Sequence, residues 1–304
     1  MSLKFKHSGR LGDIVYALPL IKSMAERAGE AAQLFIPSDI SSRLGRDVYH
    51  PGGDRLVSTG LFAFIEPLLS AQSYLQSVHY VQSTAVPADV IDLDAFKNSR
   101  LNLKGGLIQG WYRKAFGVAF PLDLPWLQLP TAEGAVQPIA WNVLIGRTTR
   151  FCNTSINYHC LQDVSRVGFI GLPYEYEDFC TRYQLTSVQH VPVENALELA
   201  QRMLQSRVYV GNQSVNFAIA DGMKICRALE AFEPAPVASP VGGLCTEYIG
   251  SSALADFISE VLNTPITASS DLDGDYCDSI KPQEGYRPSW KQRWRDRQNK
   301  KRKF

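Results

Sequence analysis

Long hydrophobic runs are missing from this sequence. No stretch of the chain approaches the run of about 18 apolar residues that a helix needs to cross a bilayer. The charged residues Lys4 and Lys6 also stand where a signal peptide would have its apolar segment. We therefore expect a cytoplasmic protein.

Several common catalytic and metal-binding motifs are missing too. The chain has no P-loop, no G-x-S-x-G and no H-E-x-x-H, which argues against a P-loop nucleotidase, an α/β-hydrolase and a zincin protease. Its six cysteines form no C-x-x-C pair and show no Cys/His spacing typical of zinc. We expect buried, reduced thiols and no bound metal.

Neither sign of charge dominates the sequence as a whole, since 31 Lys and Arg balance 30 Asp and Glu to give +1. The charge is unevenly spread, however. Residues 281–304 hold ten Lys or Arg and two Asp or Glu, which makes +8 and leaves −7 on the rest of the chain. With 45% hydrophobic and 20% charged residues, a chain of 304 residues can form one large core or two ordinary ones.

Short apolar strands alternate with helical stretches along the first part of the chain. The pattern predicts strands at 3–7, 32–36 and 90–93, and helices over 14–24 and 110–118. Glycines and prolines predict loops over 42–70 and irregular structure over 121–130, followed by a linker at 131–138.

The same alternation returns after the predicted linker. It predicts strands at 141–145, 166–170 and 207–210, and helices over 175–183, 195–204 and 217–223. Asn195 and Glu198 have the spacing of a capping box at the start of the second of these helices. Both parts of the chain therefore have the pattern of an α/β protein with a parallel sheet covered on both faces.

Two glycine-bearing turns follow predicted strands, one at 8–13 and one at 211–214. In open parallel sheets, ligands bind beyond the carboxyl ends of the strands, where helix N-termini attract anions. The spacing of Gly9 and Gly12 differs from the dinucleotide pattern. Asp13 follows this turn, and it is either a catalytic carboxylate or an acid that stabilises the helix dipole.

A third candidate site is the segment Arg147-Thr148-Thr149-Arg150, directly after a predicted strand. Two guanidinium groups beside two hydroxyls suit a diphosphate, because arginine offers a bidentate donor and threonine a neutral one. An exposed basic loop explains the same composition.

These three places, in this order, resemble a known family. The segment from Gly12 to Pro19, GDIVYALP, resembles the GD-x-[IVL]-x-x-[LT]-P signature of glycosyltransferase family 9, the heptosyltransferases of lipopolysaccharide synthesis. Residues 147–150 resemble the phosphate-contacting loop of that family, and residues 200–223 resemble its nucleotide-binding segment. The resemblance is collinear from residue 3 to about residue 225.

The resemblance implies a glycosyltransferase B architecture, with two Rossmann-like domains whose parallel sheets face each other across a cleft. It places an acceptor-side domain at 1–135 and a nucleotide-sugar-binding domain at 139–280, with the basic tail at 281–304. It further implies an inverting transferase that moves a sugar from a nucleotide-diphosphate donor to an acceptor hydroxyl such as that of a glycan. The resemblance also implies that neither a metal nor another cofactor is required.

The resemblance also assigns roles to individual residues. Asp13 corresponds to the general base, and Glu175 to the glutamate that binds the nucleotide ribose, although an acid in a first helical turn has a simple structural explanation. Residues expected to bind the donor and its phosphates are Arg147, Thr148, Thr149, Arg150, Gly211, Asn212, Gln213 and Ser214, and those expected in the acceptor-side loop are Ser8, Gly9, Arg10 and Gly12.

Three residues depart from the family pattern in the last donor loop. Gln213 replaces an acid, Val215 a glycine and Ala218 a histidine. A β-branched residue disfavours a positive φ, so we expect the backbone of Val215 to differ from that of the family's glycine. The identity of the donor therefore stays open, and so do two other functions: a nucleotide-sugar epimerase on the same frame, and a binding protein without catalysis.

The basic tail carries Trp290 and Trp294, which would share one face of a helix. A solvated tail is one interpretation of residues 287–304. Binding to nucleic acid or to an anionic membrane is the other, and it includes peripheral attachment at the inner membrane. A polyanionic acceptor such as modified DNA would combine this binding with sugar transfer.

Overall fold

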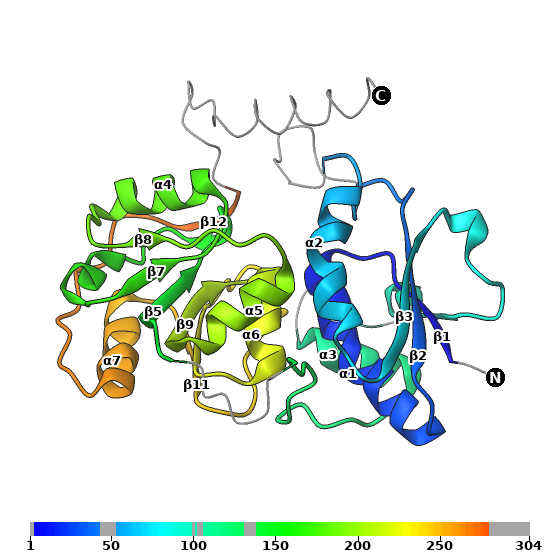
Figure 1. The fold of residues 1–304 in the computed structure, drawn as a ribbon. Coiled ribbons are helices and arrows are strands. Elements are labelled where there is room, and N and C mark those ends of the chain that lie inside the picture. Colours follow the sequence, from blue (N-terminus) through cyan, green and yellow to red (C-terminus); the bar gives the residue numbers. More distant parts are fainter. Residues whose placement is uncertain (1–2, 43–52, 99–100, 102–105, 131–137, 280–304) are drawn as a thin grey trace.

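The computed structural model describes residues 3–42, 53–98, 101, 106–130 and 138–279, and these form two α/β halves that lie side by side (Figure 1). Residues 131–137 of the linker predicted at 131–138 and the basic tail at 281–304 lie outside the described residues. The domain boundaries at 135, 139 and 280 therefore stay predictions.

The first half is built on a four-stranded parallel sheet in the order β3-β2-β1-β4. Its strands are β1 (Lys4–Lys6), β2 (Ala32–Pro37), β3 (Leu75–Val81) and β4 (Ile91–Asp92). Its helices are α1 (Leu11–Ala28), α2 (Thr59–Ser70) and α3 (Ile108–Phe116), with short 3₁₀ helices at Ser83–Ala85 and Leu93–Asn98.

A six-stranded parallel sheet in the order β11-β10-β9-β5-β7-β8 forms the second half. Its strands are β5 (Trp141–Gly146), β7 (Val167–Phe169), β8 (Gln189–His190), β9 (Ser206–Asn212), β10 (Arg227–Glu230) and β11 (Cys245–Tyr248). The helices are α4 (Pro173–Tyr183), α5 (Ala196–Leu204), α6 (Val215–Met223) and α7 (Ser251–Leu262), and a 3₁₀ helix spans Tyr158–Asp163. An antiparallel pair, β6 (Arg150–Asn153) and β12 (Tyr276–Ser279), lies beside this sheet.

The expectation of loops over 42–70 is wrong for its last part, because α2 occupies Thr59–Ser70. Ser58 caps this helix by accepting a hydrogen bond from the Leu61 amide at 3.4 Å. Gly60 lies in the first turn, and the buried Ile65 helps to hold the helix on the core. Tertiary packing thus outweighs the helix-breaking residues in the segment.

The other predicted strands and helices are present, with ends shifted by a few residues. No helix or strand forms between residues 121 and 130, as the prolines predicted. Asn195 does cap α5, but the Glu198 carboxylate accepts from the Glu194 amide instead of the Asn195 amide, so the capping box is incomplete. The strands β3, β6, β8, β10, β11 and β12 and the helix α7 were not predicted.

The two halves share a hydrophobic core. Helix α1 packs against α6 and α2 packs against α5, so these helices lie between the two sheets (Figure 1). One buried cluster includes Phe5 of the first sheet and Leu144 of the second. Across the contact, the Trp126 amide donates to the Gly222 carbonyl at 3.0 Å, and Gln109 donates to the buried Asp221 carboxylate. Among the described residues, no helix is both long and apolar enough to span a bilayer.

Candidate active site

A cavity of about 430 Å³ lies where the two halves meet. Its wall is made by the first turns of α1, α4 and α6, the loop after β5, the segment after β10, and single residues of α2 and α3. Nine of the predicted site residues line it: Arg10, Gly12, Asp13, Thr148, Thr149, Arg150, Glu175, Gln213 and Ser214. The structure therefore brings four separate sequence segments into one site.

Three helices begin at this cavity. The N-termini of α1 and α6 lie close together, since a Cβ atom on Gly12 would be 3.8 Å from the Val215 amide nitrogen. Helix α4 contributes Tyr174 and Glu175 from its first turn. The first four N–H groups of a helix have no partner within the helix, and each N-terminus carries about half a positive charge. The cavity is thus well suited to an anion.

Asp13 is the third residue of α1, and its Oδ2 atom accepts a hydrogen bond from the Arg10 amide at 3.2 Å. This contact is the dipole-compensating role that local sequence predicts for an acid in a first turn. Asp13 also lines the cavity, so the structural role and contact with a ligand are compatible. Gly9 permits the arrangement, because a Cβ atom there would overlap the His7 ring and lie 3.0 Å from Asp13 Oδ2.

A buried histidine holds the turn that carries Asp13. The Gly9 amide donates to His7 Nδ1 at 2.9 Å, and His7 Nε2 lies 2.7 Å from the Tyr112 hydroxyl. Burial lowers the pKa of His7, so the ring is neutral and its proton is on Nε2, because Nδ1 accepts. Tyr112 in turn donates to the Asp13 carbonyl at 3.4 Å. Tyr112 lies in α3, 99 residues from Asp13, which explains why no local pattern indicated it.

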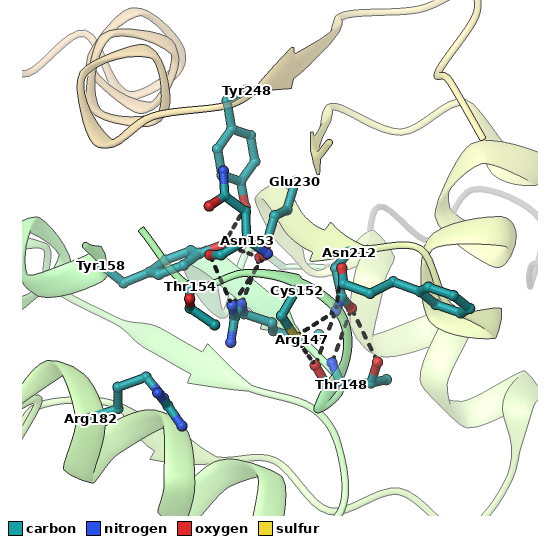
Figure 2. Close-up of polar contacts among 12 residues, drawn as sticks. Arg147, Thr148, Cys152, Asn153, Thr154, Tyr158, Arg182, Asn212, Glu230 and Tyr248 are labelled. Atoms are coloured by element: carbon teal, nitrogen blue, oxygen red, sulfur yellow. Dashed lines mark hydrogen bonds and ion pairs between the residues drawn. The ribbon is translucent and has the colours of Figure 1, made fainter. Parts of the chain in front are cut away.

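Arg147 does not line the cavity, although the sequence predicted it as a phosphate ligand. Its guanidinium is buried and donates to the Glu230 carboxylate from Nε at 2.6 Å and from Nη2 at 3.1 Å. Glu230 also accepts from the Tyr158 hydroxyl at 2.6 Å, and Figure 2 shows the three side chains converging. Arg147 is therefore neither a phosphate ligand in the cavity nor part of an exposed basic loop, and it anchors β5 to β10.

Asn212 supports the loop of Thr148 from the side that faces away from the cavity. Its side chain is fully buried and absent from the cavity wall. The Oδ1 atom accepts from the Thr148 amide at 3.0 Å, and Nδ2 donates to the Thr148 carbonyl at 3.0 Å (Figure 2). We correct its predicted role from a donor ligand to a residue that fixes the backbone of Thr148 at the cavity.

Gly211 and Ser8 also lie outside the cavity wall. Gly211 is needed for packing, since a Cβ atom would lie 2.8 Å from the Tyr209 hydroxyl and 3.0 Å from the Gly146 carbonyl. The Ser8 amide donates to the Asp94 carboxylate at 2.8 Å, and its hydroxyl donates to the same oxygen. Both residues therefore support the loops beside the site.

Glu175 is the third residue of α4 and is buried against the cavity. Its Oε2 atom accepts from the Leu172 amide at 2.9 Å. Burial raises the pKa of Glu175 from 4.5 to about 7, although hydrogen bonds from the backbone of Leu172 and Thr149 oppose the shift. The carboxyl group therefore titrates near neutral pH beside Thr149.

The loop that departs from the family pattern has a consistent local structure. Ser214 caps α6 by accepting from the Phe217 amide at 3.3 Å, and Val215 is the first helical residue, outside the positive-φ region. Gln213 donates from Nε2 to the Ala235 carbonyl at 3.0 Å, a bond that an aspartate could not donate. Ala218 is fully buried, and as an alanine it offers no imidazole where the family pattern has a histidine.

The apolar part of the cavity comes from both halves. Leu61 and Ile108 line it from the first half, and Val237 and Ala238 line it from the segment after β10. The Ile108 amide, at the start of α3, donates to the Val237 carbonyl at 3.0 Å. This bond crosses from one half to the other beside the cavity.

No group of three His, Cys, Asp or Glu side chains that could hold a metal occurs in the part of the chain that the structure describes. The polar groups of the cavity are two arginines, hydroxyl donors, two carboxyl groups and helix N-termini. Together they can bind a phosphate and, through Asp13, accept a proton.

Two parallel sheets that meet at an interdomain cavity give this chain the glycosyltransferase B fold. Similar solved structures include E. coli ADP-heptose lipopolysaccharide heptosyltransferase II, with a TM-score of 0.58, 12% identity, and coverage of 86% of this chain and 99% of that one. A family 9 glycosyltransferase from Veillonella parvula gives a TM-score of 0.55 at 11% identity, covering 88% and 90% of the two chains.

E. coli heptosyltransferase WaaC, solved with ADP-2-deoxy-2-fluoro heptose, gives a TM-score of 0.53 at 12% identity, covering 86% of this chain and 99% of that one. No protein-family model and no curated protein sequence matches the chain. At these identities the likeness shows a shared fold.

Proposed function

We propose that this protein is an inverting, metal-independent glycosyltransferase that uses a nucleotide-diphosphate sugar as its donor. The observation that carries the proposal is the single cavity in which Asp13 of the first half meets Thr148, Thr149 and Ser214 of the second. A shared fold with heptosyltransferases, one of them solved with ADP, supports the donor class.

In this reaction, Asp13 accepts the proton of the acceptor hydroxyl while the hydroxyl oxygen attacks the anomeric carbon. The bond from that carbon to the diphosphate oxygen breaks at the same time, so one displacement inverts the configuration. A carboxylate in this role contributes about 100- to 10,000-fold in rate.

The leaving diphosphate gains negative charge as the bond breaks. Thr148, Thr149 and Arg150 lie at the cavity beside the N-termini of α4 and α6, and these groups offer donors to the developing charge. Arg150 stacks on the Phe151 ring at 4.6 Å, which restricts its guanidinium. Ionised Glu175 would accept a hydrogen bond from the nucleotide ribose, and its position on the cavity wall supports this role.

The proposal is tested by screening thermal stability against nucleoside diphosphates and their sugar conjugates. A ligand at 100 times its Kd stabilises the folded state by about 2.7 kcal/mol, which raises the melting temperature measurably. The conjugates that bind are then incubated with and without candidate acceptors. Transfer that needs an acceptor supports the proposal, turnover of the donor alone indicates an epimerase, and the lack of any nucleotide binding indicates a protein of another class.

A further inference from the structure

Arg10 has an unused donor at the cavity. It is the N-cap residue of α1 and lines the cavity beside Asp13. Its Nη1 atom is buried and has no hydrogen-bond partner among the residues that the structure describes, and Arg10 makes no ion pair with them. A buried charged donor without a partner is costly, so the site is incomplete without an acceptor.

The electrostatics of Arg10 agree with this interpretation. Burial lowers the pKa of Arg10, and the charge of Asp13 opposes the shift. A guanidinium stays protonated in proteins, so Arg10 holds a full positive charge in a partly desolvated place. An anion at Nη1 would compensate that charge.

A second donor on the same helix also lacks a partner. The Tyr16 hydroxyl is buried in a residue only 6% exposed, lines the cavity, and makes no hydrogen bond within the described part of the chain. Arg10 and Tyr16 therefore give the first half of the protein two unsatisfied donors at this cavity. Such donors match an oxygen-rich, acceptor-only ligand such as a phosphate group.

The position of α1 indicates which phosphate group Arg10 would contact. Its first turn lies against the first turn of α6, with Gly12 close to the Val215 amide. Ser214 caps α6 at that point, and Thr148 and Thr149 lie on the same cavity. A diphosphate held by the second half would therefore lie next to the N-cap of α1.

The charges on the cavity wall are also consistent with a diphosphate beside Arg10. Asp13 and ionised Glu175 bring two negative charges to the cavity wall, and Arg150 brings one positive charge from the second half. Arg10 supplies the second positive charge, and it comes from the first half. Arg10 and Arg150 thus bring the side-chain charge of the wall to zero, so the wall does not repel a diphosphate and the helix N-termini attract it.

We propose that Arg10 binds the diphosphate of the donor from the first half, so that the phosphate groups bridge both halves of the protein. This inference rests on the proposed function and adds a leaving-group contact on the side of the cavity that was expected to serve the acceptor. The donor then contacts the same helix turn that carries the base, which fixes Asp13 relative to the leaving group.

The test uses the full chain and measures the Kd of ADP and of inorganic pyrophosphate by titration calorimetry. Arg10→Gln removes the charge, and Arg10→Lys keeps a charge without the planar fork. Arg202→Gln is the matched control, because Arg202 also has an unpartnered Nε among the described residues but lies on α5 away from the cavity wall.

We expect Arg10→Gln to raise both Kd values about tenfold to a hundredfold, the size of a lost charge-assisted hydrogen bond. Arg10→Lys should lie between it and the wild type, and Arg202→Gln should bind as the wild type does. Unchanged binding by a folded Arg10→Gln variant overturns the inference and leaves the proposed function standing. If that variant does not fold, wild-type affinity in Arg10→Lys overturns the inference instead.

A wild-type protein that binds neither ADP nor pyrophosphate, nor any conjugate in the screen, overturns the proposed function and this inference together. Tyr16→Phe provides an independent measurement. A weaker pyrophosphate affinity in this variant supports a phosphate subsite on α1, and its melting temperature without ligand shows whether packing has changed.

Discussion

Asp13 and Glu175 occupy the same position in two helices of opposite halves. Each is the third residue of its helix, and each accepts a hydrogen bond from the backbone N–H of the residue before the helix, at 3.2 Å and 2.9 Å. They differ in exposure, since Glu175 is buried while Asp13 is only partly so. Burial raises the pKa of Glu175, which lines the same cavity as Asp13.

The Asp13 carboxylate can be tested apart from its structural role. Asn keeps an oxygen that accepts from the Arg10 amide but cannot take up a proton, so Asp13→Asn should keep the fold and the affinity for the nucleotide. We expect the transfer rate to fall about 100- to 10,000-fold. Single-turnover kinetics and titration calorimetry measure the two quantities, and an unchanged rate would remove Asp13 from the mechanism.

Glu175 should give the protein a pH-dependent stability near neutrality. In the unfolded chain Glu175 ionises near its ordinary pKa, whereas the folded protein keeps the proton up to a pKa of about 7. The folded state therefore binds more protons between about pH 4.5 and 7, and its stability falls as the pH rises through that window. Above pH 7 the loss reaches at most about 3 kcal/mol.

Glu175→Gln does not titrate, and its amide oxygen can still accept from the Leu172 amide. Urea unfolding of both proteins at pH 5 and pH 8 should show that the variant gains stability relative to the wild type at the higher pH. Parallel pH profiles would contradict the prediction. The comparison cancels the titration of all other groups.

The ion pair of Arg147 and Glu230 should matter for folding and not for the ligand directly. Both side chains are almost fully buried, so Arg147→Met leaves the Glu230 carboxylate without its charge partner and should cost about 3–5 kcal/mol. Replacing both residues, by Met and Leu, should cost less than that single change. Chemical denaturation measures the stability of each variant.

A surface pair provides the control for this prediction. Arg182 and Asp178 form an i, i+4 pair on α4 with partly exposed side chains, so Arg182→Ala should cost about 1 kcal/mol or less. If Arg147→Met is as mild as this control, the buried pair does not have the structural role described above.

Two glycines of one turn should differ sharply in their tolerance of alanine. At Gly9 a Cβ atom would overlap the His7 ring and approach Asp13 Oδ2, so Gly9→Ala should lose about 1–3 kcal/mol and displace the carboxylate. Gly12→Ala meets nothing closer than 3.8 Å and gains helix propensity, so its stability should stay equal or rise by up to about 1 kcal/mol. Equal effects at both positions would contradict this account of the turn.

The fold class and much of the site could be predicted from local patterns. The turn before Asp13, the loop of Thr148 and Thr149, and the cap Ser214 each follow a strand, and parallel strands bring such turns to one edge. The buried ion pair of Arg147 could not be predicted, because its partner Glu230 is 83 residues away and only the fold makes them neighbours. Of the two arginines in the 147–150 segment, Arg147 is therefore a buried anchor and Arg150 lines the cavity.

Residues that support the site from distant parts of the sequence were missed for the same reason. Tyr112 reaches the Asp13 turn from α3, and the segment after β10 reaches the cavity through its bonds to Gln213 and Ile108. Neither carries a motif, since their roles depend on backbone carbonyls and on packing. Val215 starts a helix without a positive φ, as its β-branched side chain favours, and the difference from the family's glycine stays a prediction.

The packing of α1 on α6 sets how the protein can unfold and how substrates can enter. Because one apolar cluster contains residues of both sheets, separating the halves would expose a core to water, and we expect a single cooperative melting transition for both. A wide hinge motion would carry the same cost. We therefore expect ligands to enter the cavity through movement of the segments around its rim while the two halves stay packed together.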